Sequence, residues 1–481
     1  MTPRQAILTG LTICLLAFQL LVLVLLVLFP YVSDPGLASL NADIYGLLAP
    51  LSTIFLLGML YAWLLRIGTT ETRRRSSSFR SLFHFLSEPF RNLSSSVRTM
   101  SLSDSGRMFK ILSDSKLILG VSLVVSALLA FLPYRPDLNP TGSLVGVDSP
   151  LYIGWVSQML QKPLPQALQY SFVEGLEGSR PLLLVLLYVI ASAGVSPVQI
   201  VEFLPIALAP LLSLSSYIFV RFGQGSARLA GLTALFTSIS FYSTVGMWGG
   251  YYANWLGMIE AYAFLTCLLV FSRAPSALKY GSMYGLSVAL FLTHPWTWVL
   301  IVSVCLVFGV SLWRETRSLV HVKSIVGIIA TGIVLDVVKS LAFSTRTVAA
   351  DLATKTPTGF GLLVGFWNGL VDALLFTHGG LLGSWIILGL GLFGVFWLRF
   401  KDWFERLLLL WVGVASVPFL VLDSYHKARI VYDLPIPALT SVALLFFLPQ
   451  IGTRSIRWPG LWIALVFVLA AGYAIQGMLL L

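Results

Sequence analysis

Long apolar runs alternate with short polar stretches along most of the chain. Many runs approach the ~20 residues that an α-helix needs to cross a hydrocarbon core of about 30 Å. Because lipid offers no hydrogen-bond partners to a free backbone, such runs are expected to be helices. The clearest predicted spans are residues 11–32, 45–65, 117–134, 198–220, 229–246, 255–271, 296–312, 324–343, 380–398, 405–422, 433–449 and 460–480.

One further apolar segment, 281–293, is shorter than these spans. It meets the next span at His294 and Pro295, where the proline removes a backbone donor and interrupts the helical ladder. We count the segment as a separate crossing. The pattern therefore predicts an all-α polytopic membrane protein with about 13 transmembrane helices.

The composition agrees with this class. Of the 481 residues, 57% are hydrophobic and 11% are charged, whereas soluble domains carry about 25% charged residues. Cys14, Cys267 and Cys305 all fall inside predicted spans. That placement indicates core packing and argues against a disulfide framework or a metal centre.

The net charge of +11 becomes informative when it is divided between the two sides of the membrane. If the N-terminus is cytoplasmic, most lysine and arginine residues fall on the same side, as the positive-inside rule requires. Segment 66–116 carries the largest basic group. The C-terminus is then expected to face outward. The basic excess reflects orientation and attraction to anionic lipids, and we expect no nucleic-acid partner.

Two parts of the chain differ in organisation. Residues 1–116 comprise two predicted spans and a Ser- and Arg-rich cytoplasmic segment. Within it, residues 79–93 suit either a helix on the inner leaflet or a solvated linker. From residue 117 to 481 the loops are short except for two on the outer side, 135–197 and 344–379. Long ordered connections are common places for function, so we expect the site at the outer face.

The first outer loop contains the sequence Gly146-Val147-Asp148-Ser149-Pro150. Serine followed by proline predicts a helix start, with Ser149 as the N-cap and Pro150 at the first helical position. The apolar face of this surface helix is predicted to comprise Leu151, Trp155, Met159 and Leu160.

Asp148 lies just before the predicted helix start, where the helix dipole favours an ionised carboxylate. Such a group could act as a base or a cation ligand. From the local pattern alone, a simple cap is the commoner interpretation.

A second helix is predicted in the same loop. The apolar stretch from Arg180 to Gly194 is too short to span a bilayer, and counting it as a crossing would invert every later loop against the charge rule. It is therefore predicted to pack at the outer interface. Ser196 and Pro197 then precede the next span.

The order of these elements resembles the GT-C glycosyltransferases, which use polyprenyl-phosphate-linked sugars. The family includes the oligosaccharyltransferase catalytic subunits and the protein O-mannosyltransferases. The resemblance covers residues 117–481. It rests on the ordered segments Val147–Tyr152, Ser179–Leu183, Arg221–Arg228 and Ser243–Asn254.

The resemblance implies transfer of a sugar from a polyprenyl-phosphate donor to a hydroxyl of a lipid, glycan or protein. It also implies that Asp148 is the single catalytic base, that the reaction inverts the anomeric configuration and that the site is extracytoplasmic. We expect the membrane to be a prokaryotic plasma membrane, archaeal or bacterial. One departure matters: no Asp or Glu lies between Ser243 and Asn254, where the oligosaccharyltransferase branch holds a divalent metal. Since hard cations prefer carboxylate oxygens, we expect no metal and no other cofactor.

The departing phosphate needs a cation, and the last outer loop supplies candidates. His426, Lys427 and Arg429 lie close together there, although basic residues are scarce on the outer side. Charge-assisted bonds from such residues would stabilise a leaving phosphate. In the resembling family an Arg at this place binds the lipid phosphate, and Arg429 matches it. The alternative is an interfacial cluster of snorkelling side chains.

Other polar and aromatic side chains are weaker candidates for substrate contacts. The aromatic run Trp248, Tyr251, Tyr252 and Trp255 is by default an interfacial belt, and it could also form a stacking surface for a sugar ring. His294 could face the cavity or satisfy a carbonyl that the proline frees, and we favour the second role. Asp336 and Lys339 lie at membrane depth on one helix face and are expected to pair. The remaining possible substrate-binding residues are Tyr152, Glu174, Glu177, Trp248, Tyr251, Tyr252, His294 and Arg346.

Two other functions stay open. A secondary transporter or lipid flippase would show two similar halves with matching helix interruptions, whereas the sequence contains one strong interruption and no repeat. A non-catalytic membrane scaffold would use the Ser- and Arg-rich segment and leaves the loop at Asp148 unexplained.

Overall fold

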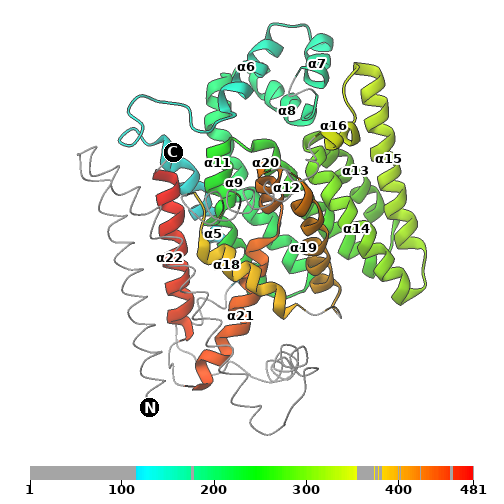
Figure 1. Ribbon diagram of the computed structural model, residues 1–481. Helices are drawn as coiled ribbons and strands as arrows, with labels where there is room; N and C mark the ends of the chain where they lie inside the picture. The colour runs from blue at the N-terminus through cyan, green and yellow to red at the C-terminus, as the bar shows by residue number, and fades with distance from the viewer. Residues whose placement is uncertain are drawn as a thin grey trace.

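The computed structural model describes residues 115–174, 178–354, 373, 378, 382–398, 400, 402–422, 424–454, 459–479 and 481. Every element within these ranges is a helix, as Figure 1 shows. The elements are α5 (Ser115–Phe131), η2 (Leu132–Tyr134), α6 (Ser149–Leu160), α7 (Leu164–Val173), α8 (Pro181–Ser192), α9 (Pro197–Gly223), α10 (Ala227–Ser238), α11 (Phe241–Gly249), α12 (Tyr252–Arg273), α13 (Ala277–Thr293), α14 (Pro295–Thr316), α15 (Val320–Phe343), α16 (Val348–Thr354), α18 (Trp385–Gly394), η4 (Val395–Trp397), α19 (Trp403–Val421), α20 (Ser424–Tyr432), α21 (Ile436–Arg454) and α22 (Pro459–Leu479).

Seven helical segments in the described part of the chain are long and apolar enough to cross a membrane. They coincide with seven of the predicted spans and confirm a polytopic α-helical membrane protein. The seven segments are Ser115–Tyr134, Pro197–Gly223, Ala227–Gly249, Tyr252–Arg273, Pro295–Thr316, Val320–Phe343 and Trp403–Leu420.

Other predicted crossings take different forms. The segment predicted as 281–293 is the 17-residue helix α13. The span predicted at 433–449 is a bent pair, His426–Tyr432 and Ile436–Leu445, with a 48° angle between its halves. Trp385–Trp397 and Val466–Leu479 are shorter apolar helices. The predicted spans 11–32 and 45–65 and the surface helix 79–93 lie outside the described residues.

Helix α9 is central to the bundle, because it packs against α5, α10 and α12. Its N-terminus carries a capping box in which Ser196 Oγ accepts from the Gln199 amide and the Gln199 side chain accepts from the Ser196 amide, which satisfies two end donors. The span Ala227–Gly249 is buried throughout its hydrophobic window. It is therefore shielded from lipid by its neighbours.

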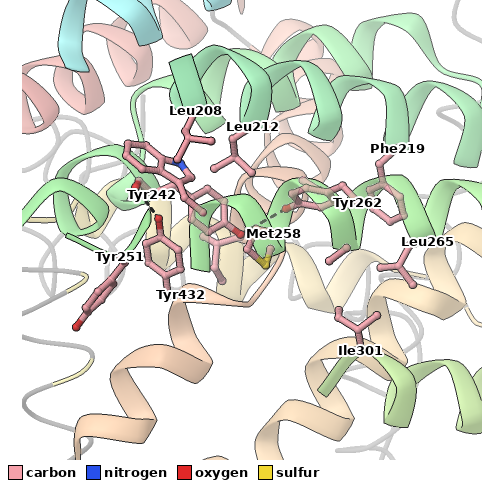
Figure 2. Close-up of a cluster of buried hydrophobic side chains, with 14 of the residues drawn as sticks. Leu208, Leu212, Phe219, Tyr242, Tyr251, Met258, Tyr262, Leu265, Ile301 and Tyr432 are labelled. Carbon is pink, nitrogen blue, oxygen red and sulfur yellow. Dashed lines mark hydrogen bonds between the residues drawn. The ribbon is translucent and has the colours of Figure 1, made fainter. Parts of the chain in front are cut away.

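The core between these helices combines aliphatic and aromatic side chains. Figure 2 shows Leu208, Leu212 and Phe219 of α9 facing Met258, Tyr262 and Leu265 of α12. The tyrosine hydroxyls in this core are hydrogen-bonded. The Tyr432 hydroxyl donates to the Tyr242 carbonyl at 2.8 Å, and the hydroxyl oxygens of Tyr242 and Tyr262 are 3.4 Å apart. Buried tyrosines keep their polar ends satisfied in this way.

Helices α6, α7 and α8 lie together at one end of the bundle, with α16 beside them, as Figure 1 shows. We call this end the α6–α8 end. Lys339 of α15 donates to the Gly178 carbonyl there at 3.3 Å, and its Nζ lies 3.9 Å from Asp336 Oδ1. The predicted pair of Asp336 and Lys339 is confirmed.

The opposite end of the bundle holds basic turns. Arg273, at the C-terminal end of α12, donates to the carbonyls of Phe222 and Gly223 at the C-terminal end of α9. A cation at these ends satisfies carbonyls that lack helical partners and complements both helix dipoles. The basic residue predicted at this turn is therefore in place, and the prediction that this end is cytoplasmic stays a prediction.

The orientation can be tested with single cysteines in a chain whose native cysteines have been removed. Ser143 is exposed at the α6–α8 end, and Ala274 is exposed in the turn between α12 and α13. In sealed cells, a membrane-impermeant maleimide should label Ser143→Cys, whereas Ala274→Cys should react only after permeabilisation. The reverse pattern would place the α6–α8 end in the cytoplasm and contradict an extracytoplasmic site.

Candidate functional site

The loop before α6 is held against the C-terminal end of α11 by backbone hydrogen bonds. The Val147 amide donates to the Trp248 carbonyl at 2.9 Å, and the Asp148 amide donates to the Gly249 carbonyl at 3.2 Å. The last carbonyls of a helix lack helical partners, and here the loop supplies their donors. Two motifs that are distant in the sequence therefore form one surface.

Gly250 makes this close approach possible. It ends α11 in the left-handed region with a φ of +66°, which glycine adopts without steric cost. A Cβ at this position would lie 2.9 Å from the Asp148 amide nitrogen. A side chain of any size would separate the loop from the helix.

The start of α6 differs from the sequence prediction. The helix begins at Ser149, and Asp148 occupies the N-cap position without a side-chain cap bond. Ser149 is buried, and its hydroxyl lies 2.5 Å from the Val145 carbonyl and 2.8 Å from the Tyr252 hydroxyl. The expectation that Ser149 caps the helix is wrong, because its side chain is used in the contact with α12.

The buried face of α6 also differs from the prediction. Tyr152, Val156 and Met159 are buried, whereas Leu151 and Leu160 are exposed. Of the face predicted for α6, only Met159 is fully buried, with Trp155 partly buried beside it. The buried face differs from the predicted one because α6 packs against α7, α8 and α9.

Arg180 joins α8 to Asp148. Its side chain is 5% exposed, and its Nη1 donates to the Tyr152 hydroxyl at 2.7 Å and lies 3.8 Å from Asp148 Oδ2. The predicted short helix in this loop is confirmed as α8, and Arg180 is at its N-cap. The sequence places Arg180 in the segment Ser179–Leu183 and predicts no role for it. No local pattern indicates which carboxylate its side chain contacts.

The Asp148 carboxyl is perturbed by its surroundings. Burial raises its pKa above the ordinary value for an aspartate, while Arg180 and Arg429 act in the opposite direction. A carboxylate with a raised pKa is a stronger base, and the two arginines preserve its ionised form. Burial and the two arginines therefore act on this carboxyl in opposite directions.

The three basic candidates lie on α20, which is a helix and not the loop that the sequence indicated. The Arg429 guanidinium stands over the Tyr251 ring, 5.2 Å from its centroid. His426 and Lys427 are buried, so the snorkelling interpretation does not apply to them. Arg429 and Asp148 are close enough for the arginine to perturb the carboxyl.

The aromatic run is mostly interior. Tyr251, Tyr252 and Trp255 are buried, whereas Trp248 is 41% exposed. The default interpretation as an interfacial belt is therefore wrong for these three residues. They face neighbouring helices, and Tyr251 also packs edge-to-face on Tyr432 with ring centroids 5.8 Å apart.

His294 has a structural role, as the sequence favoured, but the ring caps a helix and does not satisfy a freed carbonyl. Its side chain caps α14 by accepting from the Thr297 amide at 3.2 Å. Thr297 also lies 2.8 Å from Asp433 Oδ2, a buried carboxyl that sequence reasoning did not select. The only available signal was the position of Asp433 after a cluster of basic residues.

Two weaker candidates, Glu174 and Arg346, are not brought into the site by any contact within the described residues. Glu174 is exposed at the C-terminal end of α7, and Arg346 is exposed in the turn between α15 and α16. Glu177 lies outside the described residues. Within the described chain, no group of at least three His, Cys, Asp or Glu side chains is arranged to hold a metal ion.

A cavity of about 170 Å³ is lined in part by Tyr134, Asn139 and Glu202. Tyr134 is hydrogen-bonded to Tyr252, which in turn contacts Ser149. These contacts link a residue that lines the cavity to Ser149, the residue after Asp148. A second cavity, of about 220 Å³, is lined by Cys267, Lys279 and neighbouring residues near the basic turn between α12 and α13.

Comparisons with known proteins add no family assignment. No protein-family model matches the chain, and no curated protein matches it. The GT-C resemblance therefore depends on the residues quoted for it.

The docking of the loop on α11 can be tested at Gly250. Gly250→Ala should lower the free energy of unfolding by at least ~1–2 kcal/mol, because alanine is strained at positive φ and its Cβ displaces Asp148. Gly285 of α13 has open space around its Cβ position, so Gly285→Ala should be neutral or stabilise by ~0.5–1 kcal/mol. Denaturant unfolding of the purified proteins compares them, and equal stability of the two variants would contradict the docking geometry.

Proposed function

We propose that the protein is a GT-C-type membrane glycosyltransferase that takes a sugar from a polyprenyl-phosphate donor. The observation that carries the proposal is the convergence of Asp148, Arg180 and Arg429 at one end of an apolar bundle. One carboxylate and two guanidinium groups match the needs of this reaction, namely a base for the acceptor and cations for the phosphate. The family motifs in the sequence supply the reaction class.

Asp148 would act as the base. Its carboxylate takes the proton of an acceptor hydroxyl as that oxygen attacks the anomeric carbon from the face opposite the phosphate. The bond between the anomeric carbon and the phosphate oxygen breaks, and the phosphate leaves with the bonding electrons. The anomeric configuration is inverted, and a single base suffices because the leaving group is already activated.

Arg429 would hold the phosphate. A guanidinium can donate two parallel hydrogen bonds to phosphate oxygens, and the ring of Tyr251 supports its plane from one side. Arg180 would orient Asp148. The hydrogen bond from Arg180 to the Tyr152 hydroxyl holds the guanidinium in place, and the guanidinium attracts Oδ2 of Asp148. The polyprenyl chain of the donor would lie in the lipid bilayer beside the bundle.

One observation favours a secondary transporter or lipid flippase as the second candidate. The bent pair of α20 and α21 places buried Lys427 and Asp433 beside a break in the helix, and interrupted helices line the sites of many transporters. The two functions differ in outcome: an enzyme produces a glycosylated acceptor in detergent, whereas a transporter needs a sealed bilayer to show activity.

The base is tested by Asp148→Asn with radiolabelled polyprenyl-phosphate sugar and a membrane extract as the source of acceptor. Loss of general base catalysis should lower turnover by ~10²–10⁴-fold, with little change in donor affinity. Asp137→Asn is the matched control, since Asp137 is an exposed residue of the same loop, paired with Arg135. A folded Asp148→Asn protein with near-normal turnover would exclude the proposed role.

The phosphate contact is tested by Arg429→Ala and Arg429→Lys. Removing a charge-assisted bond worth about 1.5–3 kcal/mol should weaken donor binding by ~10–100-fold, and lysine should restore only part because it lacks the planar fork. Donor affinity is measured by isothermal titration with polyprenyl phosphate. Arg346→Ala, which alters an exposed arginine, should bind normally; unchanged affinity in Arg429→Ala would place the phosphate elsewhere.

A further inference from the structure

The second cavity, of about 220 Å³, lies beside the basic turn between α12 and α13. It is lined from three helices, by Cys267 and Val270 of α12, Leu278 and Lys279 of α13, and Phe222 of α9. Most of this lining is apolar, and Lys279 is its one charged member. None of these residues belongs to the candidate site at the α6–α8 end.

The rim of this cavity is apolar and exposed. Leu278 is 82% exposed and Phe222 is 55% exposed. Both stand at helix ends, next to basic residues. Large apolar side chains that accompany cations at the end of a span are typical of the boundary between acyl chains and headgroups. The cavity is therefore placed to face lipid.

Three basic side chains are held at this rim by backbone carbonyls. Arg273 donates to the last two carbonyls of α9. Lys279 Nζ donates to the Ala274 carbonyl at 2.6 Å, and Arg221 Nη1 donates to the Gly225 carbonyl at 2.7 Å. An ammonium has three donor hydrogens and a guanidinium has five. Each of the three side chains therefore keeps hydrogens that an anion can accept.

The positive charge at this rim is not matched by carboxylates. Within the described residues, none of the three cations forms an ion pair with an Asp or Glu side chain. The sequence contains no acidic residue in 203–259 or in 261–314. Glu405 of α19 reaches the neighbouring turn, where its Oε1 lies 3.4 Å from Gln224 Nε2. Three cations and this one carboxylate leave the rim with a net positive charge.

We propose that this cavity binds one anionic phospholipid. An acyl chain lies against Cys267 and Val270, and the phosphate lies among Lys279, Arg273 and Arg221. Both contacts are non-covalent. Because the lining comes from α9, α12 and α13, the bound lipid holds these three helices together at this end of the bundle.

Charge and apolar surface together favour this ligand over simpler ones. A zwitterionic phospholipid would bring a cation of its own to a rim that already has three. Inorganic phosphate would pair with the cations and leave the apolar surface uncovered, whereas burial of apolar surface is favourable. The site is independent of glycosyl transfer and can be tested without substrate.

Cys267 provides a native probe, because its partly buried thiol lines the cavity. The full-length protein is placed in vesicles of phosphatidylcholine, or of phosphatidylcholine and phosphatidylglycerol in equal parts. Alkylation by uncharged N-ethylmaleimide is followed at Cys267 by peptide mass spectrometry. The reaction should be several-fold slower with phosphatidylglycerol, and inorganic phosphate added to phosphatidylcholine vesicles should not slow it. Equal rates in the two vesicles, or protection by phosphate alone, would overturn the proposal.

Lys279→Ala tests the phosphate contact. A basic residue near a membrane surface contributes enough to change affinity for anionic lipid by about 5-fold, so protection of Cys267 should need correspondingly more phosphatidylglycerol. Lys323→Ala is the matched control, because Lys323 is an exposed lysine near the start of α15 and does not line the cavity. A general effect of surface charge on the thiol would be the same in both variants. Protection in Lys279→Ala at the wild-type lipid content would overturn the assignment of the phosphate.

Native mass spectrometry of the wild type gives a measurement that does not depend on a variant. Protein released from the mixed vesicles should retain phosphatidylglycerol in preference to phosphatidylcholine. Retention of the two lipids in equal amounts would contradict an anionic lipid site.

Discussion

The candidate site depends on two backbone hydrogen bonds, from the amides of Val147 and Asp148 to the terminal carbonyls of α11. A helix end inside a membrane protein must find partners for its last carbonyls, since lipid offers none. By supplying those partners, the loop fixes the position of Asp148 relative to α12. The left-handed backbone of Gly250 permits the approach, and the hydroxyls of Ser149 and Tyr252 complete the contact.

Around this contact the described part of the bundle buries several charged and polar side chains. Their desolvation is offset by specific partners: Arg180 has Tyr152 and Asp148, and Asp433 has Thr297. Buried charges are costly unless they are paired. Because buried charges are costly, their concentration at one end of the bundle is better explained by a functional site than by packing alone.

The hydrophobic pattern was sufficient to predict the class and most described spans. A run of about 20 apolar residues has one stable form in lipid, so the seven long segments follow from composition alone. The pattern did not predict that α20 is a helix, or that α20 and α21 meet at 48°. Helix breaks depend on which side chains neighbouring helices can satisfy, and this information is not local.

The sequence by itself determined that Asp148 stands just before a helix, that a second short apolar helix follows in the same loop, and that basic residues gather near Arg429. Only the tertiary structure decided that Arg180 faces Asp148, that Tyr251 lies under Arg429, and that Asp433 joins Thr297 and His294. The physical reason is the range of the interactions involved. Helix formation and capping act within a few residues, whereas ion pairs and buried hydrogen bonds join segments that only the packing of the bundle brings together.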